Sequence, residues 1–240
     1  GVGAAKDYPF VAFTQMSGIG WYGDLGNFLV MPTTGELKTS SGKISNPEEG
    51  YRSRYSKEDE VAKAGYYATT LTDYGIKVEA TAAAHSGILR FTFPENKQSR
   101  IQIDLARRVG GTSTEQYIKV INENTIQGWM KCTPDGGGWG NGEGNPNYTV
   151  FFYAQFSKPL KNYGVWSGDI PEDWSRKRQS IESDKFRELV ANANLEKKFK
   201  EKQGKHLGFF TEFETSEKEE VLLKSGISFV SMEGAKNNLF

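Results

Sequence analysis

Strict alternation of apolar and polar residues through the middle of the chain is the sequence feature that most limits the fold. Residues 76–81 read Ile-Lys-Val-Glu-Ala-Thr, and residues 89–93 and 101–105 repeat the pattern. A period of two places successive side chains on opposite faces of a strand, so one face can be buried. We therefore predict consecutive antiparallel strands, the first of them joined to residues 69–71 by a hairpin at Asp73-Tyr74-Gly75.

Other stretches rich in aromatic or β-branched residues, each bounded by turn signals, predict further strands. They span residues 117–121, 125–131, 148–156, 163–166, 207–213 and 227–231. About a dozen strands favour two packed sheets over one open sheet. Because all-β domains commonly reach this length without splitting, we expect residues 1–240 to form a single mainly β domain, a large antiparallel β-sandwich.

Two stretches carry helical signals instead. Ser56 is followed by Lys-Glu-Asp, which predicts a capped helix of about two turns that stops at Gly65. In residues 173–204 the apolar residues from Phe186 to Phe199 fall near helical spacing, which predicts a small helical insertion within the sandwich. Acidic and basic residues are interleaved in that insertion, so its charge indicates a solvated face rather than a nucleic-acid site.

Composition excludes several classes of function. Thirty basic and thirty acidic residues give formal neutrality, so we predict neither nucleic acid nor a membrane surface as a partner. No apolar run approaches the roughly 20 residues that a membrane helix needs. Cys132 is the one cysteine and cannot form an internal disulfide. His85 and His206 are too few and too isolated to indicate a metal cluster.

The first segment that could carry chemistry is Met-Ser-Gly-Ile-Gly-Trp-Tyr-Gly-Asp-Leu-Gly-Asn at residues 16–27, here called the first glycine-rich segment. Its glycines, Gly18 and Gly20 among them, free the backbone for a close approach to a ligand. Trp21 offers a flat apolar face to a sugar ring. Ser17, Asp24 and Asn27 offer hydrogen bonds to sugar hydroxyls. The alternative is a tight loop with Trp21 packed inside the sandwich.

A second glycine-rich segment, Gly-Gly-Gly-Trp-Gly-Asn-Gly-Glu-Gly, spans residues 136–144. It lacks the Lys and the following Ser or Thr of a phosphate-binding loop, and it runs into a predicted strand rather than a helix. Trp139 is therefore either a second sugar platform or a lid over its own sheet.

The whole chain resembles the N-terminal domain of glycoside hydrolase family 92, the exo-α-mannosidases. Residues 16–35 resemble the signature near the start of these enzymes, and the other matching pieces keep the family's order. They are residues 55–60, 65–67, 87–94, 103–105, 138–140, 148–159, 206–210 and 226–231. The resemblance implies a β-sandwich of the supersandwich, galactose-mutarotase-like type, followed by a helical toroid in the complete enzyme.

The resemblance also implies a division of labour. Family members are calcium-dependent and invert the configuration of mannose, which requires two carboxyl groups about 6.5–9.5 Å apart. In the family these carboxyl groups and the calcium ligands lie in the toroid, so we expect no catalytic residue and no metal ligand in this chain. Residues 232–240 would begin the linker to that C-terminal domain. We expect the isolated chain to be inactive.

For binding, the resemblance implies that this domain closes one side of the pocket for a mannose-containing glycan. The residues we expect to face the sugar are Ser17, Gly18, Gly20, Trp21, Asp24 and Trp139. The parent enzyme is expected to be secreted or periplasmic, and a start at Gly1 without Met suggests a processed or engineered end, consistent with removal of a signal peptide. The alternatives are a free-standing carbohydrate-binding module and a structural partner domain without sugar contact.

Two departures from the family pattern bear on substrate preference. Gln15 stands where the family usually has histidine, and His85 stands where it usually has arginine. Either change would retune the pocket or weaken catalysis in the complete enzyme.

Overall fold

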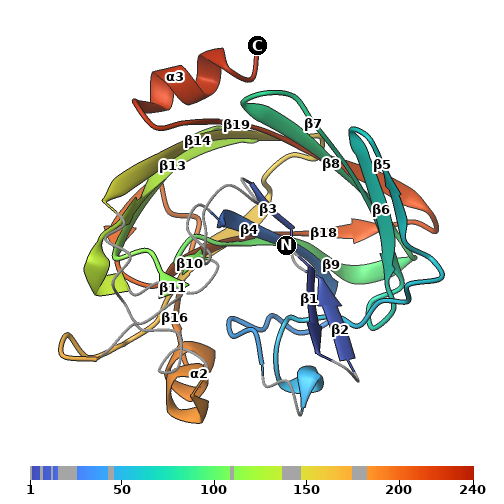
Figure 1. The fold of residues 1–240 in the computed structure, drawn as a ribbon, viewed down its shortest axis with the longest axis horizontal. Coiled ribbons are helices and arrows are strands. Elements are labelled where there is room, and N and C mark those ends of the chain that lie inside the picture. Colours follow the sequence, from blue (N-terminus) through green and yellow to red (C-terminus); the bar gives the residue numbers. More distant parts are fainter. Residues whose placement is uncertain are drawn as a thin grey trace.

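The computed structural model describes residues 2–5, 8–11, 13–15, 26–42, 46–108, 111–136, 147–174 and 183–240. Within them, two antiparallel sheets face each other across a shared apolar core (Figure 1). This confirms the predicted class, a mainly β antiparallel sandwich. Two strand pairs stand apart from the main sheets: β1 (Val2–Ala5) with β2 (Tyr8–Val11), and β10 (Arg107–Arg108) with β11 (Gly111–Thr112).

The larger sheet has nine strands and arches over the smaller one (Figure 1). In spatial order its strands are β17 (Glu201–Gly204), β12 (Glu115–Asn122), β13 (Thr125–Cys132), β14 (Tyr148–Phe156), β19 (Glu219–Ser228), β8 (Ser86–Phe93), β7 (Ile76–Ala82), β6 (Tyr66–Leu71) and β5 (Val61–Lys63). The smaller sheet has six strands. They are β16 (Asn194–Lys197), β15 (Asn162–Ser167), β18 (Leu207–Thr215), β9 (Asn96–Asp104), β4 (Asn27–Thr34) and β3 (Phe13–Gln15).

The alternating stretches form strands as predicted. Ile76 and Val78 are fully buried in the core, whereas Lys77 between them is exposed. The predicted hairpin is confirmed, because β6 pairs with β7 and Gly75 in the turn has a φ of 63°. A left-handed φ of this kind costs glycine nothing. The strand predicted at residues 227–231 is only the end of β19, which begins at Glu219 and stops at Ser228.

The helix predicted from Ser56 is wrong. The Ser56 hydroxyl accepts a hydrogen bond from the Glu58 N–H, but this closes only a local turn. Val61–Lys63 then pairs with β6 as strand β5. A serine followed by acidic residues stabilises a turn as readily as a helix start, and pairing with a neighbouring strand decided between them here.

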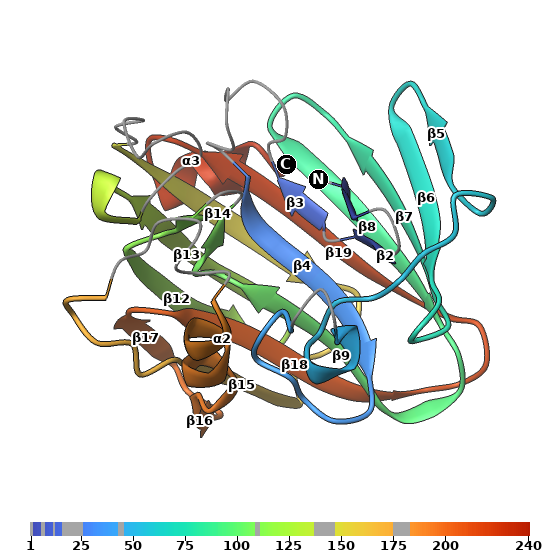
Figure 2. The same ribbon diagram turned by 60° about the horizontal axis from the view of Figure 1, so that its bottom comes forward.

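The helical insertion predicted at residues 173–204 is only partly correct. One helix, α2 (Asp184–Ala191), begins at the N-cap Ser183 and buries Phe186 and Val190. The rest of the described part of this stretch contains strands β16 and β17, which extend the edges of the two sheets. Phe199 lies between these strands and packs in the main core rather than against the helix. Both views place α2 beside β16 (Figures 1 and 2).

Strand β9 departs from the simple alternation in a way that matters for the pockets. Gln102 and Asp104 were expected to face solvent, yet both are buried. Gln102 Nε2 donates to the Lys38 carbonyl oxygen at 3.0 Å, and Asp104 accepts a hydrogen bond from Tyr51 at 2.8 Å. The segment between β4 and β5 therefore covers the outer face of the smaller sheet, and buried polar groups there are paired as burial requires.

Helix α3 (Met232–Asn237) packs on the outside of the larger sheet (Figure 1). Its N-cap is Ser231, whose hydroxyl accepts from the Gly234 N–H at 2.9 Å. The helix approaches β19 so closely that a Cβ on Gly226 would lie 2.2 Å from the Ala235 carbonyl oxygen. None of the helices in the described ranges is long and apolar enough to cross a membrane.

A charged cluster on the outer face of β7 and β8 makes stability depend on pH. Glu79 accepts hydrogen bonds from Arg90 at 2.8 and 2.9 Å and from Tyr66 at 2.6 Å. These bonds lower the pKa of Glu79 to about 2. A carboxylate with a lowered pKa stabilises the fold above its unfolded pKa, and the stability is lost as pH falls through the folded value.

We expect Glu79→Gln to lower the free energy of unfolding by about 2 kcal/mol at pH 7, a value reduced for solvent screening at the half-exposed Arg90. The difference from wild type should shrink between pH 5 and pH 2, where Glu79 itself becomes protonated. Urea unfolding of the wild-type and Glu79→Gln chains across this pH range measures the difference in the free energy of unfolding. A difference that stays constant with pH would contradict the assignment.

Candidate functional site

The described residues that flank each glycine-rich segment are paired with each other across two adjacent strands. Gln15 at the end of β3 pairs with Asn27 at the start of β4, and the first segment connects them. Cys132 at the end of β13 pairs with Tyr148 at the start of β14, and the second segment lies between these two residues in the sequence. Each segment therefore leaves from and returns to adjacent positions on a sheet.

The Asn27 side chain joins the two strand pairs. It is 1% exposed, its Nδ2 donates to Cys132 Sγ at 3.4 Å, and its Oδ1 accepts from the Tyr148 hydroxyl at 3.1 Å. Asn27 belongs to the smaller sheet, whereas Cys132 and Tyr148 belong to the larger one. These bonds bridge the two sheets and hold the bases of both segments together, although they join residues 105 and 121 positions apart.

The next residue, Phe28, has a strained backbone. Its φ is 61°, in the left-handed region that costs a non-glycine residue about 1–2 kcal/mol. Its side chain is fully buried, and its ring centroid lies 4.9 Å from that of Phe152 on β14. Strain of this size persists only where surrounding contacts fix the conformation, and it is concentrated at functional sites. The exit of the first segment is thus set by packing between the sheets.

An apolar surface borders this point. The Tyr148 ring meets the Phe229 ring edge-on, with centroids 6.2 Å apart. Phe229 is 47% exposed and the adjacent Val230 is 85% exposed. Adjacent apolar residues left exposed in this way are typical of surfaces that another domain or protein covers.

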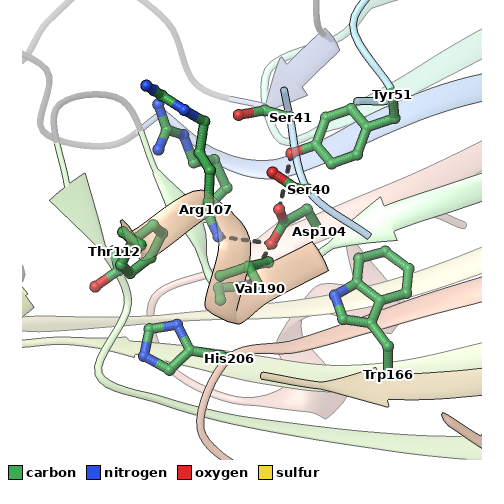
Figure 3. Close-up of a pocket in the computed structure, with 12 residues that line it drawn as sticks. Ser40, Ser41, Tyr51, Asp104, Arg107, Thr112, Trp166, Val190 and His206 are labelled. Atoms are coloured by element: carbon green, nitrogen blue, oxygen red, sulfur yellow. Dashed lines mark hydrogen bonds between the residues drawn. The ribbon is translucent and has the colours of Figure 1, made fainter. Parts of the chain in front are cut away.

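A small pocket lies between the end of β9 and helix α2 (Figure 3). At its centre the Tyr51 hydroxyl donates to Asp104 Oδ2 at 2.8 Å, and the Arg107 N–H donates to Asp104 Oδ1 at 3.0 Å. Burial raises the pKa of Asp104, and burial together with the Asp104 charge raises the pKa of Tyr51 well above its usual value. The cavity volume is about 30 Å³, which holds a water molecule or two but no sugar.

Comparison with known proteins places the chain in a family. Residues 6–228 match the family described as Glycosyl hydrolase family 92 N-terminal domain. This chain belongs to glycoside hydrolase family 92. Among solved structures, the GH92 α-mannosidase BT3965 from Bacteroides thetaiotaomicron is 36% identical over 90% of this chain, with a TM-score of 0.71. Its complex with mannoimidazole gives the same identity and TM-score.

A more distant GH92 structure, the inverting mannosidase BT2199 from Bacteroides thetaiotaomicron VPI-5482, shares 19% identity over 88% of the chain, with a TM-score of 0.61, and supports the fold alone. The chain spans about a quarter of the length of these structures, between 23% and 26%. The comparison with curated proteins found no match.

The sugar-facing residues predicted for this GH92 domain lie outside the described residues, so their roles stay predictions. They are Ser17, Gly18, Gly20, Trp21, Asp24 and Trp139. Asn27, which sequence analysis also offered to sugar hydroxyls, does not have that role, because its side chain is buried and bonded to the other sheet. Tyr148 and Cys132 are the positions that sequence analysis missed. Their sequence signal was only their place beside the second segment.

The two departures from the GH92 pattern lie in different places. Gln15 pairs directly with Asn27 at the base of the first segment. His85 lies in the turn between β7 and β8 with its side chain exposed, and its carbonyl oxygen accepts from the Ile227 N–H at 2.9 Å. Gln15 is therefore the departure at the candidate site.

Glycosidic cleavage needs a pair of carboxyl groups. Asp104 is the one carboxylate among the described residues that line the small pocket, and its hydrogen bonds to Tyr51, Ala106 and Arg107 hold it within the fold. No group of three or more histidine, cysteine, aspartate or glutamate residues in the described ranges is arranged to hold a metal ion.

Proposed function

We propose that this chain is the N-terminal domain of an exo-α-mannosidase and that its two glycine-rich segments form one side of a mannose pocket. The observation that carries the proposal is the bridge from Asn27 to Tyr148 and Cys132, which brings the bases of both segments to one place. Further support comes from the mannoimidazole complex of a GH92 α-mannosidase with 36% identity to this chain.

In this proposal five residues of the first segment have a physical task. Trp21 packs its flat face against the apolar face of mannose, and Gly18 and Gly20 allow the backbone to approach the ring. Ser17 and Asp24 bond to sugar hydroxyls, since a hydroxyl and a carboxylate together can donate and accept. A few well-placed polar groups beside an aromatic wall are the usual composition of a ligand site.

Trp139 of the second segment is proposed as a further wall of the same pocket. Its segment leaves Cys132 and returns to Tyr148, the two residues that Asn27 contacts. A ligand held between aromatic residues from two segments loses contact with water on both faces, which strengthens its polar contacts.

Catalysis is proposed to belong to a further helical-toroid domain of the same polypeptide. Inversion uses one carboxylic acid to protonate the leaving oxygen and one carboxylate to activate water on the opposite face. The acid, the base and the ligands of a calcium ion would lie in that domain, and the isolated chain would bind without hydrolysing. The parent enzyme is proposed to be secreted or periplasmic.

The surface formed by Phe229 and Val230 is proposed to pack against that domain. Phe229 is 47% exposed and its ring meets that of Tyr148, at the base of the second segment, and the adjacent Val230 is 85% exposed. Phe240 is 78% exposed, and its ring centroid is 6.3 Å from that of Tyr153. Covering these side chains would remove apolar surface from water and would orient the pocket toward the catalytic groups.

Trp21→Ala in the full-length protein tests the proposal. We expect kcat/KM for an aryl α-mannoside to fall by about 30-fold, equivalent to about 2 kcal/mol, because a buried aromatic contact is lost. Trp129→Ala is the matched control, since Trp129 stacks on Tyr117 with centroids 6.0 Å apart on the outer face of the larger sheet. Adding a chelator to the same assay tests calcium dependence. NMR detection of the first-formed anomer of the released mannose tests inversion.

Unchanged kinetics in Trp21→Ala would contradict the sugar-facing role and favour a structural partner domain. Calorimetry of the 240-residue chain with mannosides separates the remaining alternative. Binding tighter than about 1 mM that Trp21→Ala abolishes, in a full-length protein without hydrolytic activity, would favour a carbohydrate-binding module.

A further inference from the structure

A polar groove lies where one edge of the larger sheet meets the segment that follows β15. Its volume is about 580 Å³, within the range of about 300–1,000 Å³ that is typical of ligand sites. Its lining includes Glu115, Lys131, Asp135, Glu172, Trp174 and Lys205, and we call it the Lys131–Asp135 groove. Strands β12 and β13 supply Glu115 and Lys131, which are directly paired, so the sheet holds one wall rigid.

The charges in the groove select against strongly charged ligands. The carboxylates of Glu115, Asp135 and Glu172 would repel a polyanion, and the ammonium groups of Lys131 and Lys205 would repel a polycation. Lys205 donates to Glu172 at 2.6 Å. The lining therefore favours a neutral ligand with many hydrogen-bonding groups.

Two of these charged groups are available to a ligand. Within the described ranges, the side-chain ammonium of Lys131 and the carboxylate of Asp135 make no hydrogen bond or ion pair, and both residues are exposed. A carboxylate accepts hydrogen bonds from two hydroxyls and an ammonium group donates up to three, so the pair matches the mixed donor and acceptor character of sugar hydroxyls. Hydrogen bonds to charged groups are stronger than those between neutral groups.

Trp174 gives the groove a preorganised aromatic wall. It packs against the cluster of Ile170, Phe186 and Val190, and Lys185 Nζ lies 5.0 Å from its ring centroid. A tryptophan fixed in this way loses little conformational freedom when a ligand binds. Its Nε1–H is buried without an acceptor among the described residues.

We propose that the Lys131–Asp135 groove binds a neutral oligosaccharide, with Lys131 and Asp135 bonding its hydroxyls and Trp174 forming the apolar wall. The choice of a mannose-containing ligand rests on the proposed function, whereas the argument from charge and shape does not. Asp135 in η2 (Pro134–Gly136) directly precedes the second glycine-rich segment. An oligosaccharide longer than one sugar unit is therefore the ligand that would use the groove.

NMR titration of the ¹⁵N-labelled chain with a linear α-linked mannotriose tests the proposal. The chain has five tryptophans, so Trp174→Phe identifies the indole N–H signal of Trp174. We expect mannotriose to shift that signal. The double variant Lys131→Met/Asp135→Asn should bind mannotriose at least 10-fold more weakly. Lys57→Met/Asp59→Asn, in an exposed turn, is the matched control and should bind as wild type does.

Two results would overturn the proposal. One is an unchanged affinity in the Lys131→Met/Asp135→Asn variant, and the other is the absence of any shift at Trp174 with mannotriose at about 20 mM, where a millimolar site is filled. Trp21→Ala separates this proposal from the previous one. If Trp21→Ala alone abolishes binding, the groove is wrong and the mannose pocket stands. If only the groove variant loses binding, the groove stands without the pocket.

Discussion

Replacing Phe28 by glycine should destabilise the chain less than replacing it by alanine, although glycine is ordinarily the worse residue in a strand. Both variants lose the fully buried ring that packs on Phe152, a loss of about 3–5 kcal/mol. Alanine keeps the penalty of the φ of 61° at this position, whereas glycine removes it. We therefore expect Phe28→Gly to be about 1 kcal/mol more stable than Phe28→Ala.

Phe152 provides the matched control for this ordering. It is equally buried in the same ring pair, but it has no left-handed φ. There alanine should be more stable than glycine by about 0.5–1 kcal/mol. Urea unfolding of the four variants measures both orders. If Phe28→Ala is more stable than Phe28→Gly, the backbone at the exit of the first glycine-rich segment is not strained.

A methyl group on Gly208 should destabilise the sandwich by about 3 kcal/mol or more. Gly208 on β18 pairs directly with Trp166 on β15, and a Cβ there would lie 1.8 Å from Trp166 Cζ2. Trp166 is 1% exposed, so the surrounding core resists its displacement. Overpacking of a rigid core usually costs about 1–3 kcal/mol, and a contact this short belongs at or above the upper end of that range.

Gly204→Ala is the control, because a Cβ on Gly204 would come no closer than 3.5 Å to Leu207 and the residue has no left-handed φ. This variant should be neutral or stabilised by up to about 1 kcal/mol through lower entropy of the unfolded chain. Thermal unfolding should show Gly208→Ala melting about 6–12 °C below wild type. Equal melting temperatures for the two variants would mean that Trp166 does not cover Gly208.

Local sequence patterns were sufficient for most of the strands. The alternation around Ile76 and Phe91 is a property of neighbouring residues, and it requires only that one face be buried. The turn at Gly75 was equally local, because a left-handed φ is easy for glycine alone. The family signature at residues 16–35 added the sandwich type and the candidate site, which no periodicity in the chain contains.

Some sequence patterns are compatible with two structures. These predictions failed where a segment distant in the sequence decided between the two. Residues 61–63 form an edge strand because β6 is there to pair with them. Residues 194–197 and 201–204 are predominantly polar and exposed, so no alternation marks them, yet they pair with β15 and β12. The alternation predicts that Asp104 faces solvent. It is buried because the segment that carries Tyr51 covers it.

The sequence by itself determined the class of fold, the position of both glycine-rich segments and the family, because each depends on residues that are adjacent or lie in a fixed order. The tertiary structure alone decided that the Asn27 side chain is buried and bridges the two sheets, and that the bases of the two segments meet. The physical reason is distance along the chain: the bonds from Asn27 to Cys132 and Tyr148 join residues 105 and 121 positions apart. Such contacts form only when two sheets pack face to face, and no local propensity specifies them.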